Sequence, residues 1–176
     1  MIRTLSLSMM LMTGVAATAG AQALREPDPS WLSWNATTRT TTFKLIGGLT
    51  GTGAKSPFNF NGYTDGDLTL SVPQGSTVVV NFVNDDGTPH SAEVIADKKP
   101  LPNMSDGQPA IPRAYTRQAL EGLAQGQTDV MRFTAAPPGD YLFFCGVPGH
   151  GLSGMWIRLK VTADSAAAPA LALTGK

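Results

Sequence analysis

Short strand-like segments separated by turn residues are the feature that most constrains the fold of this 176-residue chain. Turn-forming pairs such as Asn61-Gly62 and Asp86-Gly87 lie between segments rich in β-branched and aromatic residues, several of which alternate apolar with polar side chains. Eight such segments can be recognised, at 41–46, 58–60, 67–72, 76–83, 91–96, 129–135, 140–145 and 155–161. Many short strands divided by turns predict an all-β fold, an antiparallel sandwich or barrel of about seven or eight strands.

One long stretch interrupts this rhythm. Residues 98–127 contain four prolines, followed by AYTRQALEGLAQG, a segment compatible with a short helix or with irregular structure. We expect an insertion between two strands that covers one side or edge of the sandwich.

The first 23 residues have the layout of a secretory signal peptide. Arg3 precedes a mostly apolar run that extends from Leu5 to Ala19, and the small residues of Ala21-Gln22-Ala23 follow. The run is shorter than the ~20 apolar residues that cross a bilayer, which argues against an uncleaved anchor helix. We therefore expect a secreted or periplasmic protein, with cleavage after Ala23 or after Ala21.

The remaining chain has the size of one domain. We expect this domain to span residues 24–162 and the Ala-rich tail, residues 163–176, to be disordered. Without Arg3, the 13 Lys and Arg of the full chain become 12, against 13 Asp and Glu, so the mature chain is nearly neutral. Nucleic-acid binding requires a clustered basic face, and no such cluster occurs in the sequence.

The sequence contains a single cysteine, Cys145, which ends the apolar segment YLFFC. A lone cysteine in an exported protein cannot form an internal disulfide. It is therefore a buried and inert residue, a partner in a disulfide between chains, or a metal ligand.

Cys145 begins the stretch CGVPGHGLSGM, which also contains His150 and Met155, and the only other histidine is His90. Taken singly, each residue has an ordinary explanation as a core or loop residue. Taken together, two imidazoles, one thiolate and one thioether form the ligand set of a blue-copper centre. Zinc is the alternative metal because it also accepts Cys and His, although it gains nothing from a thioether.

The sequence resembles the cupredoxins, small blue-copper proteins, and within them the sulfocyanin-like group, with rusticyanin as a near relative. The resemblance is carried by FNFNGYTDGDLTLSVPQGSTVVVNFVN, by PHSAEVI and by PPGDYLFFCGVPGHGLSGMWIRLKV, and it covers roughly residues 41–162. It implies a Greek-key sandwich with one type 1 copper ion held by His90, Cys145, His150 and Met155. The Cys-x4-His-x4-Met spacing is similar to that of rusticyanin, as is the serine, Ser91, that follows the first histidine. Many cupredoxins carry an Asn there, which ties the two ligand loops together.

This resemblance implies a monomeric electron carrier that cycles between Cu(II) and Cu(I) and meets redox proteins transiently. Copper enzymes with such a domain need further histidines for a catalytic copper, and this chain has only two. A copper carrier or storage protein is the other alternative, and such proteins favour exposed Met, His or Cys clusters. We therefore expect an electron carrier without a catalytic site of its own.

Overall fold

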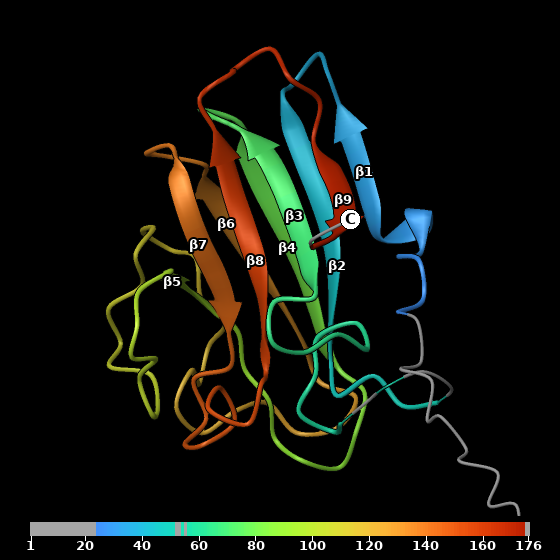
Figure 1. Ribbon diagram of the computed structural model, residues 1–176, viewed down its shortest axis with the longest axis vertical. Coiled ribbons are helices and arrows are strands. Elements are labelled where there is room, and N and C mark those ends of the chain that lie inside the picture. Colours follow the sequence, from blue (N-terminus) through green and yellow to red (C-terminus); the bar gives the residue numbers. More distant parts are fainter. Residues whose placement is uncertain (1–23, 52–53, 55, 175–176) are drawn as a thin grey trace, which may run out of the picture.

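This computed structural model describes residues 24–51, 54 and 56–174. In these residues nine strands form two sheets that pack face to face, and one 3-10 turn precedes the first strand (Figure 1). The first sheet has the strand order β1-β2-β4-β6, and the second has the order β5-β7-β8-β3-β9. The elements are η1 (Pro29–Trp31), β1 (Leu32–Asn35), β2 (Thr40–Gly47), β3 (Leu68–Pro73), β4 (Thr77–Asn84), β5 (Glu93–Ala96), β6 (Thr128–Thr134), β7 (Gly139–Phe144), β8 (Trp156–Thr162) and β9 (Ala170–Leu173).

The core lies between the sheets because alternate side chains of each strand point inward. In β4, Val78, Val80 and Phe82 are buried, whereas Asn81 is exposed. The facing sheet contributes the buried side chains of β3 and β8 in the same alternating manner. This period of two is the pattern expected of strands with one core face, and it confirms the predicted β-sandwich.

Seven of the eight predicted strands are present, and the segment 58–60 is not one of them. Phe60 makes only isolated bridges, to Gly47 and Tyr63. Its ring is nevertheless fully buried in the core. The apolar residues of this segment therefore pack into the core from a loop and do not form a strand. The prediction of a strand there is wrong.

The expectation of a purely antiparallel sandwich also needs correction. β2 pairs with β4 in parallel, and β3 pairs with β8 in parallel. Each parallel pair joins strands that are separated along the chain by at least one other segment, as parallel pairing requires a crossover connection. The remaining pairings are antiparallel.

The described part of the C-terminal tail, residues 163–174, for which we expected disorder, includes a short strand. Residues Ala170–Leu173 form β9, which pairs antiparallel with β3, and Leu173 is buried opposite Leu68. The Thr174 N–H also donates to the Asp67 carbonyl. The tail is held because its two leucines alternate with alanines, so that one face of a short strand is apolar.

The insertion 98–127 lies between β5 and β6 and contains no helix or named strand over its length. Part of it runs along the free edge of β5, where Val94 N–H donates to Ala114 and Ala110 N–H donates to the Val94 carbonyl. Leu101 packs on the outer face of β7 against Leu142 and Phe144. The insertion thus covers both an edge and a side of the sandwich, as predicted, and its conformation is irregular.

The predicted signal peptide, residues 1–23, lies outside the described residues. Within the part of the chain that the structure describes, we find no helix with the length and apolar character needed to span a bilayer.

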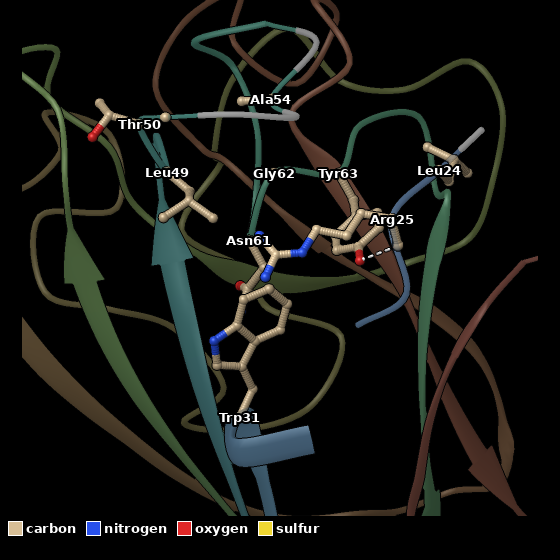
Figure 2. Close-up of a pocket in the computed structure, with 10 residues that line it drawn as sticks. Leu24, Arg25, Trp31, Leu49, Thr50, Ala54, Asn61, Gly62 and Tyr63 are labelled. Atoms are coloured by element: carbon tan, nitrogen blue, oxygen red, sulfur yellow. Dashed lines mark hydrogen bonds between the residues drawn. The ribbon is translucent and has the colours of Figure 1, made fainter. Parts of the chain in front are cut away.

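A small pocket opens where the N-terminal segment meets the loop that follows β2 (Figure 2). Tyr63 donates its hydroxyl to the Arg25 carbonyl at 2.7 Å, and its ring meets Trp31 edge to face. The cavity of about 30 Å³ has room for only one or two water molecules. Because it is this small, we read it as part of the packing of the N-terminal segment and not as a substrate site.

Candidate metal centre

The end of β7 places Cys145 inside the sandwich. Phe143 points into the core, and two residues further along the chain Cys145 points the same way and is fully buried. Its backbone N–H donates to the Met155 carbonyl at 3.1 Å, just before β8 begins. The two ends of the loop between β7 and β8, at the lower end of the sandwich in Figure 1, are therefore fixed to each other.

Turn hydrogen bonds bring His150 back toward Cys145. The His150 N–H donates to Val147 at 3.1 Å, and the Met155 N–H donates to the His150 carbonyl at 3.1 Å. At Gly151 the loop crosses the ring of Phe144 so closely that a Cβ atom would overlap it. A glycine is required there, because no larger side chain lets the histidine loop pack on the strand end.

His90 reaches the same place from the loop after β4. Its backbone is paired in both directions with Leu123 of the insertion, at 3.2 Å from His90 N to the Leu123 carbonyl and 2.8 Å for the reverse bond. The Asn84 side-chain amide also donates to the Leu123 carbonyl, at 2.8 Å. The insertion therefore holds this histidine in place from outside the sandwich.

The three predicted ligands His90, Cys145 and His150 converge. The two histidine Nδ1 atoms are 3.2 Å apart, and the Cys145 Sγ lies 3.6 Å from the His150 Nδ1. All three donor atoms lie within 4.8 Å of one another. Residues separated by up to 60 positions in the sequence thus present three metal-binding atoms to one point.

Met155 is fully buried and lies beside this cluster. Its backbone is hydrogen bonded to both Cys145 and His150, so the thioether residue enters β8 directly from the ligand loop. Its assignment as a weak fourth ligand stays a prediction.

Burial governs the electrostatics of the cluster. It lowers the pKa of His150 to about 4, with a further lowering by the nearby His90. It also lowers the pKa of His90, against the opposing effect of Asp86. Burial raises the pKa of the Cys145 thiol, although the backbone amides of Ser91 and Val147 and the Ser91 hydroxyl act in the opposite direction. Both imidazoles are therefore neutral near pH 7, with lone pairs available, and a bound cation would favour the thiolate.

Ser91 ties the two ligand loops together. The Gly146 N–H donates to the Ser91 hydroxyl at 3.1 Å, and that hydroxyl donates to the Ala119 carbonyl at 2.6 Å. Its oxygen lies 3.9 Å from the Cys145 sulfur. The serine thus bridges the cysteine loop, the histidine loop and the insertion.

Two residues beside the cluster, Phe58 and Asp86, were not predicted from the sequence. The Phe58 ring lies 4.6 Å from the His150 ring and 6.5 Å from the His90 ring, between centroids. The Asp86 carboxylate oxygen Oδ1 lies 3.1 Å from the His90 Nε2, although not along the direction of the ring N–H. No local pattern points to Phe58, which is 32 positions from His90 in the sequence. Asp86 could have been predicted as a neighbour of His90, because it lies only four positions before that histidine.

The donor set fits a soft or borderline metal. Mg²⁺ and Ca²⁺ prefer oxygen ligands, whereas this cluster offers two imidazole nitrogens and one sulfur at the end of a buried strand. A buried thioether residue beside two imidazoles and a thiolate matches copper better than zinc, which gains nothing from methionine.

Residues 28–172 match the family described as the Sulfocyanin (SoxE) domain. A sulfocyanin from Sulfolobus acidocaldarius is 33% identical over 118 residues, which cover 64% of this chain and 59% of that relative. A rusticyanin from Acidithiobacillus ferrooxidans is 30% identical over 95 residues, which cover 53% of this chain and 59% of that protein. The alignments thus span less than two thirds of the length of either relative.

The solved structures agree at the level of the fold. The 1.27 Å structure of rusticyanin from Thiobacillus ferrooxidans superposes with a TM-score of 0.52 at 22% identity, covering 76% of this chain and 88% of that structure. Since the family match extends over nearly the whole described sandwich, the chain belongs to the sulfocyanin family of cupredoxins, whose cofactor is one type 1 copper ion.

Proposed function

We propose that this protein is a secreted or periplasmic electron carrier, with copper held by His90, Cys145, His150 and Met155. The observation that carries the proposal is the convergence of the two histidines and the thiol sulfur, whose donor atoms lie within 4.8 Å of one another, with His90 and Cys145 buried and His150 half-buried. When bound there, copper would supply the redox chemistry, since it accepts and releases a single electron between Cu(II) and Cu(I).

The protein's contribution is to hold the donors still. Cys145 and Met155 are fixed by a backbone hydrogen bond, His90 is paired with Leu123, and Ser91 bridges the loops. Donors that are locked by packing and hydrogen bonds move little when the charge of the centre changes. A small change in geometry supports rapid electron exchange.

The exposed edge of His150 is the proposed route for electrons. His150 is half-buried, unlike His90, and the neighbouring Leu152 is 57% exposed. Pro148 is also exposed on this loop. A small apolar surface over a half-buried ligand suits the weak and transient encounters of redox partners.

The alternatives are less well supported. A catalytic copper would need further histidines, and both histidines of this chain belong to one cluster. A copper carrier that hands over its metal needs accessible ligands, whereas Cys145 and His90 are fully buried. We therefore propose a carrier of electrons without a catalytic site of its own. The apolar run and the Ala-x-Ala pattern at residues 21–23 support export.

Copper titration of the purified protein, followed by visible spectroscopy, tests this proposal. We expect an intense thiolate-to-copper absorption that bleaches with a mild reductant and returns with an oxidant. Cys145→Ser should abolish the band without unfolding the sandwich, whereas the control Ser153→Ala, an exposed residue of the same loop, should keep it. A colourless Cu(I) complex that readily releases its metal would instead support a copper carrier, and a blue band in Cys145→Ser would show that the ligand is misassigned.

A further inference from the structure

The two nitrogens of the His90 ring face different environments. Nδ1 lies in the donor cluster, 3.2 Å from the Nδ1 of His150. Nε2 lies 3.1 Å from the carboxylate oxygen Oδ1 of Asp86. The His90 side chain is fully buried and that of Asp86 is 13% exposed, so the contact is shielded from solvent.

The loop is built to keep this carboxylate in place. The Thr88 N–H donates to the Asp86 Oδ1 at 2.8 Å, and the Asp86 N–H donates to the side-chain oxygen of Asn84 at 3.3 Å. An aspartate side chain that accepts from a backbone N–H two residues further along the chain is fixed in a turn, and the Asn84 bond holds the Asp86 backbone. Asp86 is therefore held beside His90 whether or not the ring moves.

Gly48 leaves the space that the contact occupies. Its φ is +64°, and a Cβ atom there would lie 2.6 Å from Asp86 Oδ2 and 2.8 Å from His90 Nε2. Any side chain at this position would push the carboxylate and the imidazole apart. Gly48, the residue after β2, thus leaves room for the close approach of Asp86 and His90, which both lie on the loop after β4.

We infer that Asp86 is a positioning residue for the metal centre: it keeps the proton of His90 on Nε2, turns Nδ1 toward the metal and strengthens this nitrogen as a donor. The inference rests on the proposed function for its effect on copper. A neutral imidazole carries one ring proton. If Nε2 were unprotonated, its lone pair would lie 3.1 Å from the carboxylate oxygen, so electrostatic repulsion favours the proton on Nε2, although the oxygen lies off the N–H direction, and Nδ1 then has the free lone pair. A carboxylate behind a ligand histidine also stabilises the more highly charged metal state, here Cu(II) over Cu(I).

The neighbouring Asp85 provides a matched control. It carries the same charge on the same loop, but its Oδ2 accepts from the backbone N–H and the hydroxyl of Thr50, both at 2.9 Å. Asp85→Asn removes one negative charge near the site without touching the His90 ring. Asp86→Asn removes the same charge together with the anionic contact.

The first measurement uses metal-free protein. Long-range ¹H–¹⁵N NMR of the histidine rings is readily assigned because the chain has two histidines. In the wild type, His90 should carry its proton on Nε2, and Asp86→Ala should lose this preference. A wild-type His90 with its proton on Nδ1 would overturn the inference even if every variant failed to fold.

The second measurement is the reduction potential of the copper protein. Asp86→Asn should lower the ratio of Cu(II) to Cu(I) affinity about tenfold, a rise of about 59 mV for a one-electron couple. Asp85→Asn should move the potential by less than half as much. Equal shifts for the two variants, or no shift for Asp86→Asn while the blue band persists, would overturn the assignment. If the wild type forms no blue complex, the proposed function fails, and the metal-free measurement still decides the role of Asp86.

Discussion

At the scale of the single residue, Met155 separates metal binding from the tuning of the metal. Met155→Leu keeps the volume and the apolar character of a fully buried site, so the fold should be retained. Copper should still bind through the nitrogen and thiolate ligands, but loss of the thioether donor should raise the potential by at least about 59 mV, equivalent to a tenfold change in relative affinity.

Redox titration checks this expectation. Met131→Leu is the matched control, since Met131 is a buried methionine of β6. An unchanged potential in Met155→Leu would argue that its sulfur is not a ligand.

Glu93 is a second informative residue, because it is an acid buried to 1% exposure. Burial raises its pKa above the ordinary value of 4.5, although the hydroxyl of Ser105 donates to it at 2.8 Å. A carboxyl with a raised pKa binds more protons in the folded than in the unfolded state, so its contribution to stability is complete below pH 4.5 and is lost as the pH rises through the raised value.

Glu93→Gln cannot ionise, so it should remove the loss of stability that the wild type suffers as the pH rises. The variant should therefore be at least as stable as the wild type at pH 7. Its amide oxygen can still accept the bond from Ser105. Denaturant unfolding at pH 4 and pH 7 measures the difference, and the same substitution at an exposed glutamate, Glu121→Gln, is the control. A variant that loses stability equally at both pH values would contradict this account of the charge.

At the scale of the element, the loop between β7 and β8 combines metal binding with a docking surface. Leu152→Asp places a charge on this apolar surface, so electron self-exchange between oxidised and reduced copies should slow about tenfold, the effect of about 1.4 kcal/mol at a small interface. Line broadening in NMR spectra of mixed redox states measures the rate.

Val130→Asp is the control for this prediction. Val130 is 58% exposed against 57% for Leu152, but it lies on β6 in the other sheet. The visible spectrum should be intact in both variants. Equal slowing by the two substitutions would place the docking surface elsewhere.

At the scale of the whole molecule, a bound metal ion should stabilise the folded state, because its ligands come from loops that follow strands of both sheets. His90 follows a strand of the first sheet, whereas Cys145 follows a strand of the second. A ligand that binds only the folded state at 100 times its dissociation constant stabilises it by about 2.7 kcal/mol. For a domain of this size the Tm should rise by roughly 5–10 °C.

Calorimetry of the metal-free protein, with and without one equivalent of copper, checks this effect. Mg²⁺ serves as the control, because a nitrogen and sulfur site has little affinity for it. A Tm that copper leaves unchanged would argue that the three donors do not bind one ion.

The sequence by itself predicted seven of the strands and the residues that we propose as metal donors. Alternation with period two is a local property, so β4, with Val78, Val80 and Phe82 inward, could be predicted from its own residues. The ligand residues could be proposed because one cysteine, two histidines and one methionine at blue-copper spacing leave few other uses.

Only the tertiary structure decided which distant segments meet. β9 was missed because alanines dilute its apolar signal, and its strand exists through pairing with β3, about 100 positions earlier in the chain. Phe58 and Asp86 reach the histidines through loop conformations that depend on packing and on the space left by Gly48. Contacts of this kind depend on the packing of segments that are distant in the sequence, so they cannot be predicted from a short stretch of neighbouring residues.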